Sequence, residues 1–159
     1  MGDLLVKLYE LPDEGTAKER PIAQGIRLKR PLSAEKSLIC RWVKEHFSEG
    51  WSDEVSLAFS GQPVTCFIAL NEASDPVGFA CYDATFRGFF GPTGVLESHR
   101  GQGIGTALLL RALHAMSEAG YAYAVIGFSG ADDFYARTVG AVPIEGSTPG
   151  PYRDRVRRG

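Results

Sequence analysis

One stretch of this chain places three glycines, Gly101, Gly103 and Gly105, at alternate positions before a run of strong helix formers. It runs from His99 to Leu110 and reads HRGQGIGTALLL. A glycine inside a helix costs about 1 kcal/mol relative to alanine. The first four N–H groups of a helix also have no carbonyl partner within it, and the peptide dipoles leave partial positive charge there. The pattern therefore indicates either a tight turn into a packed helix or a loop that approaches an anion.

Two other glycine signatures do not fit this stretch. The dinucleotide-binding pattern Gly-x-Gly-x-x-Gly/Ala fails because its last position falls on Thr106 or Leu108. A P-loop requires a Gly-Lys pair, and the sequence has none. The sequence also has no Gly-x-Ser-x-Gly motif and no set of His, Cys and acidic residues at metal-ligand spacing, so we expect neither a serine hydrolase nor a bound metal.

Length and charge limit the remaining classes. A chain of 159 residues is predicted to form one domain, and a formal net charge of −2 gives no electrostatic footprint for nucleic acid or an acidic membrane. Three cysteines in apolar surroundings, Cys40, Cys66 and Cys81, favour reduced thiols over a disulfide framework. With no apolar run near 18 residues and no signal peptide at the start, we expect a cytoplasmic protein with no membrane or nucleic-acid partner.

Hydrophobic periodicity predicts alternating element types, which favours a mixed α/β sheet with helices on both faces. The residues from 12 to 21 have the composition of a loop, and Ser33 is the expected N-cap of the first helix. Gly91, Pro92 and Gly94 interrupt one strand, as at a bulge or a close approach of a ligand, and Pro143 suits an edge strand. The predicted strands span 4–11, 25–32, 64–70, 76–83, 88–97, 121–128 and 141–144, and the predicted helices 33–47, 52–59, 104–119 and 131–140.

The segment from Arg100 to Gly105 matches the Arg/Gln-x-x-Gly-x-Gly/Ala signature of the GCN5-related N-acetyltransferases. It lies between an irregular strand and a long amphipathic helix, as in that family, and the later DDFYARTVGAVPI resembles the family's Phe-Tyr helix and final strand. The resemblance covers roughly 26–144. It implies a mostly antiparallel mixed sheet with a splayed strand pair at the cofactor site, in a single acetyltransferase domain of 1–159. Residues 1–25 then form an N-terminal strand and loop, and 145–159 a tail.

This resemblance implies acetyl-CoA as co-substrate, with its pyrophosphate held by backbone N–H groups of the glycine loop. The strand before the loop would hydrogen-bond the pantetheine arm through its backbone. Arg100 would either contact a phosphate or have a structural role in the loop. The expected cofactor-binding residues are Val95, Leu96, Arg100, Gly101, Gln102, Gly103, Ile104, Gly105 and Thr106.

Tyr135 matches the general acid of the family, which protonates the departing thiolate. Its phenol, with an ordinary pKa of about 10, stays protonated at neutral pH, although a packing role is the alternative. No carboxylate occupies the strand at 88–95, where some members carry a base, so we expect the amine to enter neutral or to lose its proton through water. Asp83 is expected to pair with Arg87. The aromatic residues expected to line the substrate pocket are Trp51, Tyr82, Phe89 and Phe90.

The resemblance therefore implies an acetyl-CoA-dependent N-acetyltransferase that acts on a small-molecule amine in a ternary complex. A catalytically silent acyl-CoA-binding or sensing module is one alternative, because Phe128 or Ser129 stands where the family often has asparagine. One residue more than usual also separates Tyr135 from Gly140. A protein N-acetyltransferase is a further alternative, and a homodimer is left open.

Overall fold

Seven strands form one mixed sheet in the order β2-β3-β4-β5-β6-β1-β7. The computed structural model describes residues 2–157. All neighbouring strands are antiparallel except β5 and β6, which are parallel. The strands are β1 (Leu4–Lys7), β2 (Arg27–Lys29), β3 (Cys66–Leu70), β4 (Pro76–Tyr82), β5 (Phe89–Val95), β6 (Tyr123–Ile126) and β7 (Val142–Pro143). The helices are α1 (Glu14–Ala23), α2 (Lys36–His46), α3 (Glu49–Ala58), α4 (Ile104–Glu118) and α5 (Asp132–Val139).

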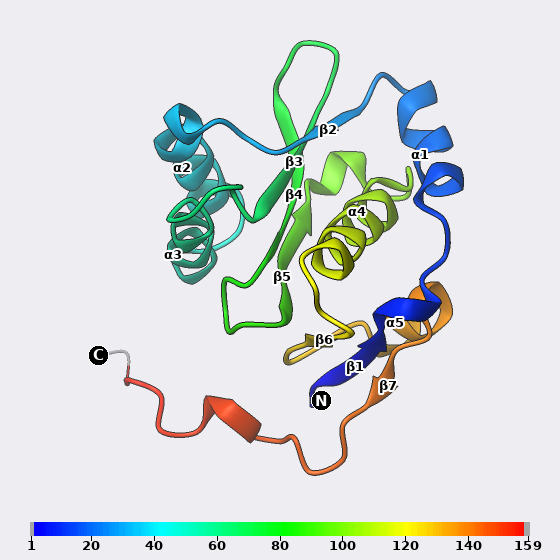
Figure 1. Cartoon of the computed structure of the whole chain (residues 1–159). Helices are drawn as coiled ribbons and strands as arrows, with labels where there is room; N and C mark the ends of the chain where they lie inside the picture. The colour runs from blue at the N-terminus through cyan, green and yellow to red at the C-terminus, as the bar shows by residue number, and fades with distance from the viewer. Residues whose placement is uncertain (1, 158–159) are drawn as a thin grey trace.

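Helices cover both faces of this sheet, which confirms the predicted fold class (Figure 1). Side chains alternate along a strand, so β3 supplies Cys66 and Ile68 to one layer and Phe67 and Ala69 to the other. The first pair packs with α2 and α3, and the second packs with α4 and with the buried side of α5. The three cysteines are free, as expected.

The long helix α4 follows the predicted apolar rhythm, and Ile104, Leu108 and Met116 are fully buried. The same apolar rhythm predicts that Arg111 faces away from the protein, and the structure shows that this prediction is wrong. Its guanidinium lies over the Phe67 ring, 4.7 Å from the centroid, because a long arginine stem can pack on apolar surface while its charge finds a partner.

The N-terminal segment differs from its prediction. The strand expected at 4–11 ends at Lys7, and a short 3-10 turn, Leu8–Glu10, follows. The segment expected to be a loop contains α1, which begins after Asp13. The Asp13 carboxylate accepts a hydrogen bond from the Gly15 N–H, and Glu14 pairs with Lys18 one turn later at 2.6 Å. These local contacts stabilise a helix in a segment whose glycine and proline residues had indicated a loop.

Other element boundaries also differ from their predictions. Ser33 lies inside a 3-10 turn, Ser33–Glu35, and is not the N-cap; the Glu35 carboxylate instead accepts the Leu32 N–H at 2.7 Å. The next helix, α3, begins earlier than predicted because the Ser48 hydroxyl caps it by accepting from the Trp51 N–H. The strand β2 is shorter than the predicted 25–32.

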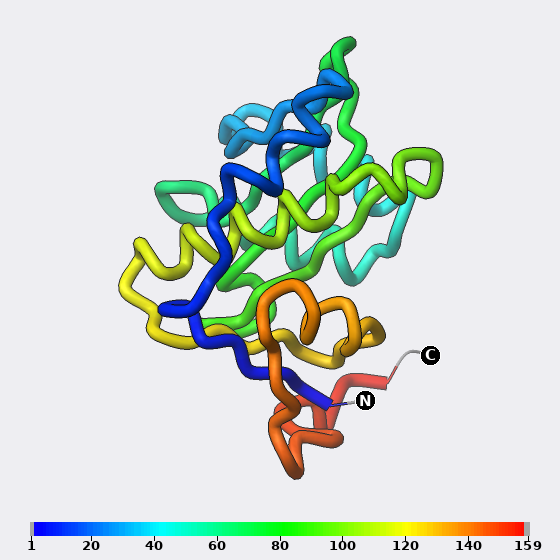
Figure 2. Tube along the Cα trace, turned by 90° about the vertical axis from the view of Figure 1, so that its right-hand side faces the viewer, coloured from blue at the N-terminus to red at the C-terminus, as the bar shows by residue number. Residues whose placement is uncertain are grey.

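The first and last strands pair at one edge of the sheet. Strand β1 lies between β6 and β7, so that Leu4 pairs with Ile126 on one side and Pro143 on the other. Beyond β7 the chain folds back below the sheet, near the N-terminus (Figure 2), and Asp3 donates its N–H to the Ser147 hydroxyl at 2.8 Å. Pro143 lies on the edge strand, as predicted.

Candidate active site

The glycine loop leaves the start of α4 open. Gly101 and Gly103 have φ of 77° and 80°, a left-handed conformation that glycine adopts without a Cβ clash. Gly103 is the N-cap residue, and no side chain caps the helix there. The first N–H groups of α4, from Ile104 to Thr106, therefore keep their capacity to bind an anion.

Helix α1 holds this loop from its carbonyl side, a contact that sequence reasoning missed. The Arg20 guanidinium donates to the Gly101 carbonyl at 2.5 Å, and the Gln24 amide donates to the Gln102 carbonyl at 3.4 Å. Fixing the carbonyls fixes the direction of the adjacent N–H groups as well, because each peptide unit is planar. Two features of the sequence could have predicted α1, and with it this contact: the Asp13 cap and the Glu14–Lys18 pair at the start of the helix.

Strands β5 and β6 part just before this loop. They pair only at Phe89 and Phe90, after which β5 stays paired with β4 as far as Val95 but leaves its other edge without a strand partner. Between Phe90 and Thr93, β5 carries one residue more than the facing part of β4, so a bulge lies at Gly91 and Pro92, as predicted. The splayed pair that the resemblance implied is therefore present.

The backbone of β5 points one peptide group into this gap. The Leu96 N–H donates to the Val77 carbonyl of β4 at 2.9 Å, so it is engaged within the sheet. Because neighbouring peptide groups of a strand point in opposite directions, the Val95 N–H faces the side away from β4. The Val95 carbonyl accepts from the Arg100 Nε at 3.2 Å, which gives Arg100 a structural role in the loop.

Tyr135 lies where the two strands part. It is the fourth residue of α5, and its ring contacts Phe90 edge-on with the centroids 6.4 Å apart. Burial raises the pKa of the Tyr135 phenol above its ordinary value of 10. Among the described residues its hydroxyl makes no hydrogen bond, so it is free to donate to a ligand.

A model of the acetyltransferase (GNAT) family matches residues 36–141. The chain belongs to the GNAT family of acetyltransferases. A comparison with curated protein sequences finds no match.

Solved structures support the same fold for this GNAT protein. One is the glucosamine N-acetyltransferase region of a fungal multi-domain GH3 β-N-acetylglucosaminidase, with 15% identity, a TM-score of 0.72, and coverage of 87% of this chain and 19% of that one. A GCN5-related N-acetyltransferase from Sphaerobacter thermophilus has 22% identity, a TM-score of 0.67, and coverage of 89% and 47%. Another from Kribbella flavida has 23% identity, a TM-score of 0.61, and coverage of 89% and 53%. This chain thus spans about half the length of these structures, or less.

The four aromatic residues predicted to line a substrate pocket separate into two groups. Tyr82 and Phe90 lie in the core, each 3% exposed, and neither reaches an open surface. Trp51 and Phe89 are partly buried and lie nearer the surface. Hydrophobicity alone marks all four, whereas strand alternation turns Tyr82 and Phe90 toward α4 and the core.

Trp51 belongs to an aromatic cluster on the α2 and α3 side of β5. The Phe47 ring lies 5.7 Å from the Trp51 ring and 5.3 Å from the Phe79 ring. Gly94 of β5 faces this cluster, and a Cβ there would come within 2.5 Å of Phe47. Glycine at this position lets the cluster pack against the part of β5 that has parted from β6.

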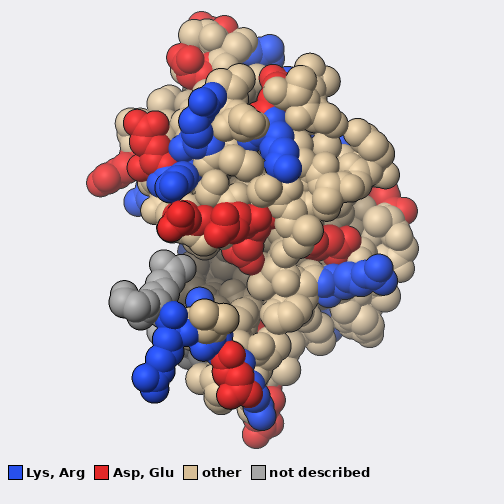
Figure 3. Space-filling view, turned by 90° about the vertical axis from the view of Figure 1, so that its left-hand side faces the viewer, with Lys and Arg blue, Asp and Glu red and all other residues tan. Residues whose placement is uncertain are grey.

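A second aromatic cluster lies at the start of β5. Tyr152 of the C-terminal segment contacts Phe86 and Phe128, at centroid distances of 6.1 and 5.3 Å, and Phe86 contacts Phe89. Burial and the negative charges of Asp3 and Glu54 raise the pKa of Tyr152 to about 12. Figure 3 shows that the surface is hollowed between the α3 side of the protein and the C-terminal segment, with acidic side chains along the upper edge.

Three titratable residues near β5, Asp83, Glu97 and His99, could in principle act as bases. Asp83 does not form the expected pair with Arg87; its carboxylate accepts from the Tyr121 hydroxyl at 2.9 Å and from the Gly88 N–H at 2.7 Å. The His99 ring contacts the Ser98 hydroxyl at 2.9 Å, and Glu97 is exposed in the 3-10 turn Glu97–His99 that follows β5.

At the family's asparagine position, the Phe128 N–H donates to Asp3, and the Ser129 hydroxyl accepts from the Ala131 N–H. Ser129 thus organises the turn into α5. Within residues 2–157, no three His, Cys, Asp or Glu side chains gather as a metal site would require. Over the same residues, every helix is too short or too polar to cross a membrane.

Proposed function

We propose that this GNAT protein transfers the acetyl group of acetyl-CoA to the amine of a small molecule, by direct attack within a ternary complex. One observation supports this most: a strand with one edge unpaired is followed, after a short turn and the glycine loop, by an uncapped helix start. The first feature suits an extended chain with amide groups, and the second suits a pyrophosphate. Acetyl-CoA carries both in the same order.

The residues present fit the two ends of this ligand. The N–H groups from Gln102 to Thr106 would face the pyrophosphate, while Arg20 and Gln24 hold the loop carbonyls on the other side. The Val95 N–H would donate to the pantetheine arm. Leu96 would not donate a hydrogen bond to the pantetheine arm, because its N–H is already bonded to the Val77 carbonyl within the sheet.

Tyr135 supplies the proton for the departing thiolate. The amine nitrogen attacks the thioester carbonyl carbon, the carbon–sulfur bond breaks, and the phenol donates its proton to the sulfur. The nitrogen gives up one proton to water as the amide forms, and a proton from water restores the phenol. The raised pKa of Tyr135 keeps the phenol protonated at neutral pH, so the acid is in its working form before substrate binds.

The amine proton leaves without a dedicated protein base in this account. The Asp83 carboxylate is engaged by the Gly88 N–H and the Tyr121 hydroxyl, the His99 ring contacts only its neighbour Ser98 among the described residues, and no carboxylate lies on β5. An alkyl amine with a pKa of about 10.4 is neutral in only about one molecule in 2,500 at pH 7. The rate would then follow the supply of neutral amine.

Turnover of acetyl-CoA with a panel of amines tests the proposal. The panel contains amino sugars, polyamines, aromatic amines and lysine-containing peptides, and thiol release is followed for each. Saturable acetylation of a small amine is the expected result. Acetylation confined to the peptides would make the chain a protein acetyltransferase. Tight CoA binding with no turnover on any amine would make it a sensing module.

A further inference from the structure

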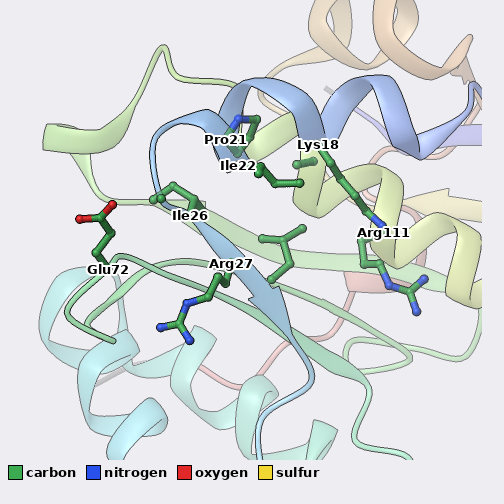
Figure 4. A pocket seen from close by; sticks show the side chains of 10 residues that line it. Lys18, Pro21, Ile22, Ile26, Arg27, Glu72 and Arg111 are labelled. Atoms are coloured by element: carbon green, nitrogen blue, oxygen red, sulfur yellow. The ribbon is translucent and has the colours of Figure 1, made fainter.

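A cavity of about 580 Å³ lies between α1, β2 and α4 (Figure 4). None of its lining residues belongs to the glycine loop, to β5 or to α5, so it lies outside the site described above. The volume is within the range of small-molecule sites. The proposed acetyl transfer gives this cavity no role.

Apolar side chains form most of the cavity wall. Ile26 and Leu28 come from the edge of the sheet, Pro21 and Ile22 from α1, and Ala107 from α4. Ile22 is 62% exposed, so its side chain can contact a ligand that enters from solvent. Such a wall favours a ligand with an apolar body.

The polar residues of the wall carry an excess of positive charge. They are Lys18, Arg27 and Arg111 against a single acid, Glu72. Lys18 and Arg111 both pair with the same carboxylate of Glu14, at 2.6 and 3.6 Å. One carboxylate between two cations leaves a positive charge at this end of the cavity, where it can attract an anion.

The last turn of α1 connects this cavity to the glycine loop. Pro21 lines the cavity, and its ring also comes within 3.7 Å of the position that a Cβ on Gly103 would take. Arg20, the preceding residue, makes the same approach and donates to the Gly101 carbonyl. A ligand that orders this turn therefore orders the loop.

We propose that the cavity between α1, β2 and α4 binds a small anion with an apolar body, and that its occupancy strengthens CoA binding by fixing α1 against the loop. The coupling half of this statement rests on the proposed function. The binding half does not, because it concerns residues that acetyl transfer leaves unused.

Direct titration of the apo protein tests the binding half, with octanoate as the probe and octylamine as its cationic counterpart. Calorimetry should show saturable binding of octanoate and at least about tenfold weaker binding of octylamine. Ile22→Asp should weaken octanoate binding about tenfold or more. Leu57→Asp, which changes an exposed apolar residue on α3, should leave octanoate binding unchanged.

The lysines offer a second matched pair. Lys18→Gln should weaken octanoate binding about threefold or more, and Lys44→Gln on α2 should have no effect. Equal binding of octanoate and octylamine would overturn the anion preference. Octanoate binding that survives Ile22→Asp in a folded variant would overturn the location, and no binding at all would overturn the site.

Titration of CoA with and without saturating octanoate tests the coupling. CoA affinity should rise about fivefold, octanoate affinity should rise by the same factor with CoA present, and Ile22→Asp should abolish both changes. Unchanged CoA affinity would overturn the coupling. If CoA does not bind at all, the proposed function fails, while the octanoate titrations still decide whether the cavity is a site.

Discussion

Replacing Tyr135 by phenylalanine should lower turnover strongly and leave the fold and the CoA affinity almost unchanged. Tyr135 is 9% exposed, but its hydroxyl makes no hydrogen bond among the described residues. Removing that hydroxyl breaks no protein contact, so the free energy of unfolding should change by less than about 0.5 kcal/mol. The hydroxyl matters only when the thiolate leaves, and a general acid typically contributes about 10²- to 10⁴-fold, or about 2.7 to 5.4 kcal/mol of activation free energy.

Tyr82→Phe is the matched control. Tyr82 is also buried, but its hydroxyl accepts a hydrogen bond from the Arg30 guanidinium at 2.9 Å. Losing a bond to a charged donor should cost about 1.5–3 kcal/mol of stability and leave turnover intact. The two variants should therefore differ in opposite ways. Tyr82→Phe should lower the free energy of unfolding in urea, whereas Tyr135→Phe should lower the steady-state rate of thiol release. Equal kcat in Tyr135→Phe and the unmodified protein would refute the role of the phenol and return Tyr135 to packing.

Three further results are expected. Gly94→Ala should lower the free energy of unfolding in urea by about 1–3 kcal/mol, because the new Cβ meets the Phe47 ring. Adding Phe47→Leu to this variant should restore much of that loss, and additive effects of the two changes would contradict the contact. Arg20→Met should weaken CoA binding about three- to tenfold in calorimetry by releasing the loop carbonyl, and unchanged affinity would show that the loop holds itself. In steady-state assays, kcat/KM for strongly basic amines should rise about tenfold per pH unit from pH 6 to 8.5, and kcat/KM for aromatic amines should stay nearly flat. Tyr135 should cause no decline in this range, because burial raises the pKa of its phenol above the ordinary value of 10. A plateau below pH 8.5 for the basic amines would reveal a dedicated base.

The strongest local patterns in the sequence predicted the parts of the fold nearest the site. The three glycines and the apolar rhythm after them predicted α4 and its open start. Gly91 and Pro92 predicted the bulge in β5, since neither residue suits a regular strand interior. In both places the local chemistry and the tertiary structure favour the same conformation.

The missed parts depend on contacts between distant segments. Helix α1 contains Gly15 and Pro21, which read as loop residues, and its partners on α4 and the glycine loop are some 80 or more residues away. The same limit explains Tyr82 and Phe90, which have the character of pocket residues but face the core once the strands pair. The hydrophobic pattern within one segment does not determine how that segment pairs with another.

Binding of CoA to the glycine loop tests the central claim most directly, by calorimetry on the unmodified protein, Gly103→Asp and Gly146→Asp. Both glycines have positive φ, and a Cβ meets nothing closer than 3.7 Å at Gly103 and nothing within 4 Å at Gly146, so the two substitutions strain the backbone alike. Only the first places a carboxylate at the open start of α4, where a pyrophosphate would lie. We expect Gly103→Asp to weaken CoA binding by more than about tenfold, or about 1.4 kcal/mol, and Gly146→Asp to leave it unchanged. Equal CoA affinity in a folded Gly103→Asp protein would contradict the assignment of this loop as the CoA site.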